Sequence, residues 1–298
     1  MTPPHPLPDP LAAERRDLNG RAGRMALWRA GQGAPVLLVH SINAAASAYE
    51  VRPVVEAIVP GRRAFAPDLP GFGASDRSAR RYDIALYGAA IDDALDAIAD
   101  ECGGDVPVDV LALSLSAEFA ARAALRRPHR VRTLTLVTPT GLDRRSATLR
   151  APPGTDRQVP GLHRVLSQPL WAQALFNALT SRASVRYFLQ RTWGGKAIDE
   201  GLAAYSWATA RQPGARHAPL AFLSGRLFGK DIRTVYEQLA LPVWVPHGTR
   251  GDFQDFSGAD WTAARPLWRL QAFDAGALPH FEHPAAFGAA FRAFLDAA

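Results

Sequence analysis

The chain has 298 residues, 48% of them hydrophobic, and a formal net charge of +6. This length can bury a full core in one large domain, or in a domain that carries an insertion. Cys102 is the single cysteine, which excludes an intrachain disulfide and a thiolate metal cluster. The basic residues are almost all arginines scattered along the chain, so the charge predicts solvated surface and not a nucleic-acid-binding face.

The first residues are rich in proline and contain no basic region followed by an apolar run. This composition predicts a disordered tail over residues 1–12 and no signal peptide. No apolar stretch reaches the ~20 residues that a helix needs to cross a bilayer. We therefore expect a cytoplasmic protein without a membrane partner.

Short apolar runs and stretches of helical spacing then follow one another. Asn19-Gly20 predicts a hairpin turn between two extended segments within residues 15–28. Further strands are predicted at 36–39, 63–67, 108–113, 131–137, 241–245 and 268–273. Helices are predicted at 47–58, 82–100, 115–125 and 284–295.

Strands that alternate with helices at this spacing predict a mainly parallel sheet covered by helices on both faces. Such sheets bind ligands at the carboxyl ends of their strands, and His40, Asp68 and Ser114 all follow predicted strands. The glycine-rich loop at 71–73 lacks the third glycine of a dinucleotide fingerprint. No nucleotide cofactor is expected.

The alternation stops between residues 141 and 239. This segment predicts several helices and forms an insertion into a core made of residues 13–140 and 240–298. We expect it to act as a helical lid, or cap, over the strand ends. Most of its aromatic side chains are expected to pack between helices, and they favour an apolar pocket beneath: Trp171, Phe176, Tyr187, Phe188, Trp193, Tyr205 and Trp207.

Ser114 stands where an apolar run stops and helical spacing begins, at Leu115 and Phe119. A strand that turns into a helix on a single serine is typical of a nucleophile elbow. That turn needs small neighbours two residues away on each side. Here they are Ala112 and Ser116, where the usual pattern has glycines.

Five motifs, in this order, resemble those of the α/β-hydrolase fold superfamily. They are Leu37-Leu-Val-His-Ser41, Asp68-Leu-Pro-Gly-Phe-Gly-Ala-Ser75, the Ser114 elbow, His247-Gly248 and Leu278-Pro-His-Phe-Glu-His-Pro284. The resemblance covers nearly the whole chain outside the tail and the insertion. It implies an eight-stranded, mostly parallel sheet with a helical lid between the sixth and seventh strands.

The resemblance also implies roles for particular residues. Ser114 would be the nucleophile, and the backbone N–H groups of Leu115 and Ile42 would form the oxyanion hole. His40 and Asn43 lie in the same loop as Ile42 and are expected to contribute to it or to bind substrate. The acid of such a site would be Asp252, one residue beyond its usual spacing, with Asp255 as the second candidate.

The usual histidine of the last loop is missing, because Ala277 occupies its position. Three explanations stay open. His280 could turn back as a displaced base. The chain could be a non-hydrolytic member that uses His40 or His247 in acid–base work, or neither. An engineered His→Ala change is the third, although departures elsewhere favour a naturally divergent member: Ser41, Ala112, Ser116 and Gly251.

These residues lead to one expected function and one rival. The expected function is hydrolysis of a small, largely apolar ester-like substrate by Ser114. The rival is a non-hydrolytic protein of the same fold, either a ligand-binding pseudoenzyme or a lyase or isomerase. Neither needs a cofactor, and His280 and His283 lack a third ligand for a metal site. The expected partner is the small-molecule substrate alone, without nucleic acid.

Overall fold

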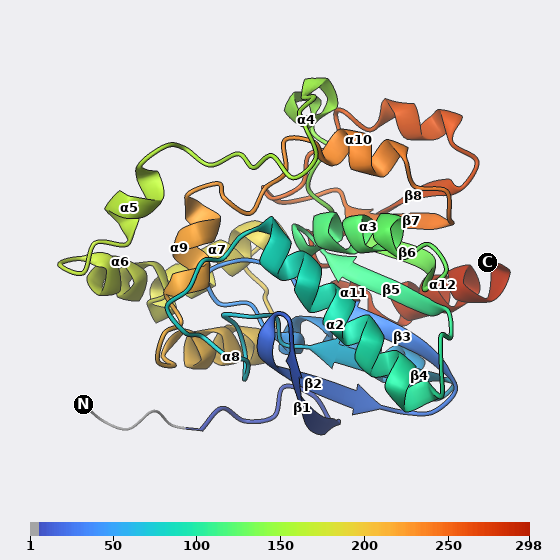
Figure 1. Cartoon of the computed structure of the whole chain (residues 1–298), viewed down its shortest axis with the longest axis horizontal. Helices are drawn as coiled ribbons and strands as arrows, with labels where there is room; N and C mark the ends of the chain where they lie inside the picture. The colour runs from blue at the N-terminus through green and yellow to red at the C-terminus, as the bar shows by residue number, and fades with distance from the viewer. Residues whose placement is uncertain (1–5) are drawn as a thin grey trace.

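The computed structural model describes residues 6–298. Its centre is an eight-stranded sheet in the order β1-β2-β4-β3-β5-β6-β7-β8 (Figure 1). The strands are β1 (Glu14–Gly20), β2 (Gly23–Ala30), β3 (Ala34–Val39), β4 (Arg62–Pro67), β5 (Val108–Leu113), β6 (Val131–Val137), β7 (Val243–Gly248) and β8 (Trp268–Phe273). This confirms the expected α/β-hydrolase fold.

All pairings from β4 onward to β8 are parallel, and β1 and β2 are antiparallel to their neighbours. The register sets the third and fifth strands side by side, with Val39 opposite Ala112. Because parallel strands end at one edge, this pairing brings the loop at His40 next to the turn at Ser114. The sheet thus assembles both motifs from positions more than 70 residues apart.

Helices cover both faces of the sheet. Outside the insertion they are the 3₁₀ helices η1 (Ala48–Val51) and η2 (Asp260–Ala264), and α1 (Arg52–Ile58), α2 (Ile84–Cys102), α3 (Ser116–Arg126), α11 (Pro279–Glu282) and α12 (Pro284–Ala297). Helices α2 and α3 pack on one face, and α1 and α12 on the other. None of the helices in residues 6–298 combines the length and apolar character needed to span a bilayer.

Between β6 and β7 the chain forms seven short helices. They are α4 (Arg144–Thr148), α5 (Leu162–Leu166), α6 (Ala172–Leu179), α7 (Arg182–Trp193), α8 (Glu200–Ala210), α9 (His217–Leu223) and α10 (Ile232–Glu237). Figure 1 shows α5 to α9 on the side toward which the β5 arrow points. Helix α10 packs against α3 on the face of the sheet.

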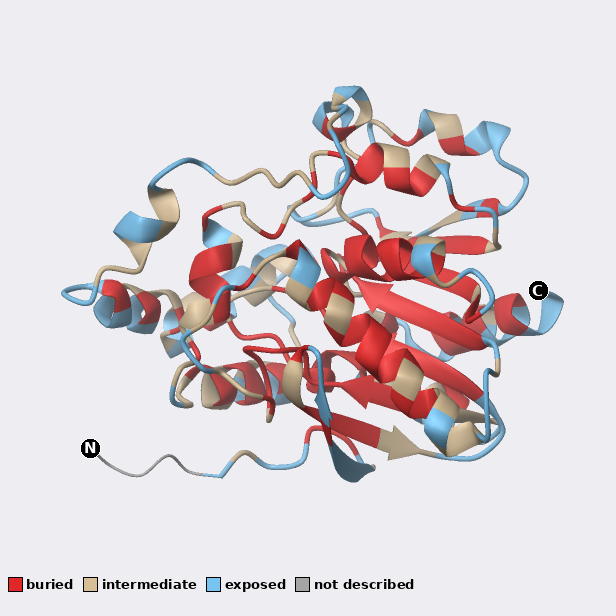
Figure 2. Ribbon diagram, in the orientation of Figure 1, coloured by how far each residue is buried: buried red, intermediate tan, exposed pale blue. Residues whose placement is uncertain are grey.

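Two apolar clusters form the core, one on each face of the sheet, and Figure 2 shows the buried strands and inner helix faces in red. Trp244 of β7 anchors the second cluster. It is fully buried and contacts Phe287, Phe291 and Phe294 of α12. The i, i+4, i+7 spacing of these phenylalanines places them on one helix face, which is why α12 docks on the sheet.

The strands at 108–113, 131–137 and 268–273 have the predicted bounds. The hairpin turn differs: Gly20 pairs with Gly23, so Arg21 and Ala22 form the turn and Asn19-Gly20 ends the strand. The predicted tail is also partly ordered. Leu11 is buried in the second cluster, because apolar contact fixes this residue, whereas residues 1–5 lie outside the described chain.

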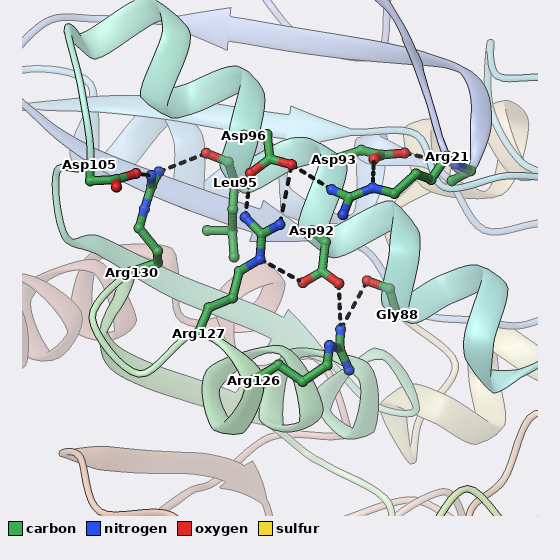
Figure 3. A network of polar contacts seen from close by, with 11 residues as sticks. Arg21, Gly88, Asp92, Asp93, Leu95, Asp96, Asp105, Arg126, Arg127 and Arg130 are labelled. Carbon is green, nitrogen blue, oxygen red and sulfur yellow. Dashed lines mark hydrogen bonds and ion pairs between the residues drawn. The ribbon is translucent and has the colours of Figure 1, made fainter.

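A polar network joins α2, α3 and the β1–β2 turn (Figure 3). Asp92 and Asp96 lie one turn apart on α2. Arg126 contacts Asp92, Arg127 contacts both carboxylates, and Arg21 reaches Asp96 from the turn. Several of these side chains are half-exposed, so each pair contributes little to stability, at most about 1 kcal/mol.

Candidate active site

Ser114 lies at the turn between β5 and α3 with φ +50°, in the left-handed region. Among residues 6–298 it shares this feature with one other non-glycine residue, Thr138 at the end of β6. Its N–H donates to Val137 O, and its carbonyl accepts from Ala117 N, so both ends of the turn are fixed. A non-glycine residue held in this region stores strain of about 1–3 kcal/mol, as expected of a functional turn.

Ser116 explains why a serine can stand where the usual elbow has a glycine. It is fully buried, and its hydroxyl donates to His40 O at 2.6 Å. This bond ties the start of α3 to the loop that follows β3. The side chain therefore fastens the two parts of the predicted oxyanion hole to each other.

The N–H groups of Ile42 and Leu115 donate to no acceptor within residues 6–298. Two unpaired N–H groups beside the elbow are what an oxyanion hole needs. The loop around Ile42 is held by Glu50, whose carboxylate accepts from Ser41 N and Asn43 Nδ2, both at 2.8 Å. Sequence reasoning missed Glu50, which lies in an apolar stretch without a recognisable motif.

His40 and Asn43 shape this loop from inside. The Nε2 atom of His40 accepts from Leu69 N at 2.9 Å, and its Nδ1 contacts Ser41 O at 2.6 Å. Both ring nitrogens of this fully buried histidine are therefore occupied. Asn43 bonds Glu50, Ser41 and Ala45 N. The expected contact with substrate does not fit His40, whose ring bonds only backbone groups.

No imidazole within residues 6–298 forms a hydrogen bond with the Ser114 hydroxyl. The Nε2 atom of His280 instead donates to Glu50 O at 2.8 Å, and its ring packs on Phe281 and Phe287. His247 contacts Gly248 O through Nδ1 and stacks near Phe256. The displaced-base interpretation of His280 is thus unsupported in this conformation, because the ring is held by a backbone carbonyl.

Ala277 is buried and fixed at both ends of its peptide unit. Its N–H donates to Thr192 O at 2.8 Å, and its carbonyl accepts from Thr138 Oγ1 at 2.9 Å. Thr192 belongs to the end of α7, so the loop that carries a histidine in related sites is here bonded to the insertion. A small side chain at 277 and a glycine at 276 permit this approach: a Cβ on Gly276 would lie 2.2 Å from Thr192 O.

The predicted acid is bonded to the same part of α7. The carboxylate of Asp252 pairs with the Arg191 guanidinium, and its N–H donates to Arg191 O at 3.2 Å. Gly251, at φ +89°, adopts a conformation that favours glycine and lies against Arg191 O. The second candidate, Asp255, accepts from Ser257 N, a bond that lowers the pKa of this carboxyl. Neither carboxylate has an imidazole partner.

A cavity of about 210 Å³ lies beside the elbow, between α3, the end of β6 and the loop after β7. Glu118, Thr140, Arg157 and Asp252 are among its lining residues, and Ser114 is not. Glu118 is fully buried, and this burial raises the pKa of its carboxyl to about 7. Its oxygens accept from Thr140 Oγ1 and from Gly229 N. No cluster of potential metal ligands occurs within residues 6–298.

Burial of His280 lowers the pKa of its imidazole from 6.5 to about 4. Between pH 6.5 and about 4 this imidazole is protonated in the unfolded chain but neutral in the folded protein. The stability that His280 contributes above pH 6.5 is therefore lost as the pH falls to about 4. Acidification over this pH range lowers the free energy of unfolding of the unsubstituted protein. We expect this decrease to be about 3 kcal/mol smaller in His280→Gln.

Urea unfolding at several pH values measures this difference. Glu118 titrates in both proteins, so its contribution cancels in the comparison. His283→Gln removes an exposed histidine three residues away and is the matched control. Parallel pH profiles for His280→Gln and the unsubstituted protein would contradict the prediction.

Comparison with known proteins agrees with the fold. A family model described as the alpha/beta hydrolase fold matches residues 34–217. A 2-hydroxy-6-oxo-2,4-heptadienoate hydrolase of Pseudomonas putida is 29% identical over 182 residues, which are 57% of this chain and 63% of that protein. A polyketide synthase, ThaQ, of Burkholderia thailandensis is 33% identical over 147 residues, 49% of this chain but 7% of the synthase. The alignments thus span less than two thirds of either relative.

Two solved structures illustrate the similarity of fold. A serine hydrolase involved in carbazole degradation, CarC, has a TM-score of 0.75 at 18% identity, covering 96% of this chain and 100% of that one. An esterase of Exiguobacterium antarcticum has a TM-score of 0.72 at 15% identity, covering 95% and 100%. At these identities the likeness concerns the fold.

Proposed function

The chain belongs to the α/β-hydrolase fold family, and we propose that it is a slow hydrolase of a small, largely apolar ester-like substrate. The observation that carries this proposal is the elbow: Ser114 at φ +50° beside the unpaired N–H groups of Ile42 and Leu115. The hydrolase relative from P. putida supports the reaction class.

In the proposed reaction the Ser114 oxygen attacks the carbonyl carbon and loses its proton to a water molecule, and water returns a proton to the departing alkoxide. The carbonyl oxygen takes the negative charge and accepts hydrogen bonds from Ile42 N and Leu115 N. Collapse of this intermediate expels the alcohol and leaves an acyl-serine, which water then hydrolyses. Each oxyanion-hole donor contributes about 10²–10³ to the rate of such reactions.

The slow step is expected to be deprotonation of Ser114, because no imidazole accepts its proton. A serine without a base is a weak nucleophile at neutral pH. Sites that lack a triad member keep roughly 10³–10⁴-fold catalysis over water, from the oxyanion hole and binding. We propose that the 141–239 insertion covers this site as a lid.

A second function is favoured by the bonds of Ala277 and Asp252 to the end of α7. These bonds occupy the two loops that would supply the base and the acid. A protein arranged in this way could bind a carbonyl compound at Ile42 and Leu115 without forming an acyl-serine. This is the non-hydrolytic alternative.

A fluorophosphonate probe distinguishes the two functions, because it phosphonylates a serine only where the hydroxyl can attack. We expect slow but saturable labelling of one site, detected by intact mass and located at Ser114 by peptide mapping. Ser114→Ala should abolish the labelling. Ser41→Ala removes a neighbouring hydroxyl from the oxyanion loop and is the control for non-specific reaction. Folded protein that stays unlabelled would refute the hydrolase proposal.

A further inference from the structure

The positive charge of this protein is concentrated in one segment. Residues 157–230 contain ten lysines and arginines but only two carboxylates, Asp199 and Glu200. The remainder has 24 basic and 26 acidic residues and is therefore slightly negative. Residues 157–230 thus carry a formal charge of +8, and the whole net charge of +6 arises within this segment.

The charges in this segment are also left unpaired. Outside it, 18 of the 24 basic residues form ion pairs, which neutralise them locally. Within residues 157–230 only Arg186 and Arg191 do so. Arg164, Arg182 and Lys196 are exposed and pair with no carboxylate among the described residues. The excess positive charge of residues 157–230 is therefore largely not neutralised by ion pairs.

Large exposed apolar side chains gather in the same segment. Seven of the nine such residues in the described chain lie between 157 and 230: Val159, Val165, Leu170, Trp171, Tyr187, Phe188 and Leu223. Leu170 is the most exposed, at 89%. The expectation that the aromatic residues of the insertion pack between helices is wrong for Trp171, Tyr187 and Phe188, which are exposed.

Several of these apolar residues adjoin one another. Val159 N donates to Ser224 O, next to Leu223, and the Trp171 indole donates to Val165 O at 3.0 Å. Helix α5 contacts α9 but has no buried residue of its own. Figure 2 shows α5 and the α5–α6 loop mostly in tan and pale blue, at the edge of the molecule. We call Val159, Arg164, Val165, Leu170, Trp171 and Leu223 the cap face.

We propose that the cap face is a peripheral docking surface for an anionic lipid bilayer. Unpaired arginines are attracted to acidic headgroups, at a gain of about fivefold in affinity per cation. Exposed leucine, valine and tryptophan on a basic helical segment suit the boundary between headgroups and acyl chains. A bilayer deforms around a projecting side chain such as Leu170, whereas a protein partner would need a matching pocket.

This inference is independent of the proposed hydrolytic function, since it involves no residue of the Ser114 site. It also differs from the expectation of no membrane partner, which came from the lack of a spanning segment. Peripheral attachment needs no such segment, because charge and a few inserted side chains suffice. Such attachment would hold the insertion against the bilayer, which is a source of apolar esters.

Co-sedimentation of the full chain with vesicles tests the proposal. We expect binding to phosphatidylcholine vesicles that contain about 30% phosphatidylglycerol, weak binding to pure phosphatidylcholine, and a marked loss in high salt. The triple change Arg164→Gln, Arg216→Gln, Arg226→Gln removes the cap-face arginine and two arginines beside it, which bond Gln173 and Gln158 and pair with no carboxylate among the described residues. It should weaken binding on the order of a hundredfold. The double change Leu170→Ser, Trp171→Ser should weaken it at least about tenfold.

Matched variants outside the segment separate location from total charge. Arg265→Gln, Arg269→Gln, Arg292→Gln removes the same charge from exposed arginines that form no ion pair. Phe253→Ser, Leu267→Ser removes the other two exposed apolar side chains. Equal losses in these controls would overturn the proposal. The proposal would also be overturned if the unsubstituted protein did not bind anionic vesicles at low salt. Binding to polyglutamate or oligonucleotides without binding to these vesicles would count as such a failure.

Discussion

Ala277→His should raise the turnover of p-nitrophenyl acetate by about 10²–10⁴, the range that a positioned general base contributes. The substitution places an imidazole at the position where the sequence resemblance predicts the base. Ser114 already lies on a turn at φ +50°, and the N–H groups of Ile42 and Leu115 donate to no acceptor within residues 6–298. Turnover should increase with pH around 6.5, as the new imidazole loses its proton.

The gain should be larger when Asp252 is freed. In the unsubstituted protein the Asp252 carboxylate is paired with Arg191, so it cannot orient an imidazole at full strength. Arg191→Gln breaks this pair while keeping a polar side chain at the end of α7. We expect Arg191→Gln alone to change turnover little, and the double variant with Ala277→His to exceed Ala277→His alone.

Two further variants make this prediction specific. Ala277→Gln introduces a side chain of similar size without a basic nitrogen, so it should leave turnover unchanged. Adding Ser114→Ala to the Ala277→His protein should remove the gain. If the histidine variant folds with a normal melting temperature and gains nothing, the rest of the proposed hydrolytic site is not functional.

Asp231→Ala should lower the free energy of unfolding by about 3–5 kcal/mol, the cost of leaving a buried charge without its partner. Asp231 lies where the insertion returns to the core, and its two oxygens accept from Arg122 of α3 at 2.8 and 2.5 Å. Both side chains are at least nine-tenths buried. Asp231 also accepts from Gly154 N at 2.7 Å, so the substitution leaves three donor atoms unpaired, two of Arg122 and one of Gly154.

Chemical denaturation with guanidinium chloride measures this effect. Asp96→Ala is the matched control, since it removes a half-exposed aspartate that pairs with Arg127, the residue after α3. That change should cost less than about 1 kcal/mol. Replacing both Arg122 and Asp231 by apolar residues of similar volume should recover most of the loss, because neither member of the pair is then left as an unpaired buried charge. Equal losses for Asp231→Ala and Asp96→Ala would contradict the argument.

The end of α7 connects these observations. Residues Arg191 to Gly194 pack against the loops at Gly251 and Gly276, and backbone bonds reach Asp252 and Ala277 from the same short segment. Three glycines allow this close approach of three chain segments. The alanine at 277 and the tight docking of the insertion therefore belong to one structural arrangement.

The fold and the elbow could be predicted from the sequence because both depend on local patterns. Apolar runs that alternate with helical spacing define parallel strands and crossover helices. Ser114 lies where the predicted strand at 108–113 is followed directly by the predicted helix at 115–125. That Ala277 occupies the position of a missing base is implied by the resemblance of residues 278–284 and stays a prediction.

Contacts between distant segments were decided only by the tertiary structure. Glu50 holds the oxyanion loop, Arg191 pairs with Asp252, and His280 bonds Glu50 O, each across a separation that no periodicity encodes. The same holds for charge. Composition gives +6 for the chain, but only the folded structure shows that, within residues 157–230, Arg186 and Arg191 alone pair with a carboxylate among the described residues. Local patterns fix which element a residue joins, whereas its partner depends on how those elements pack.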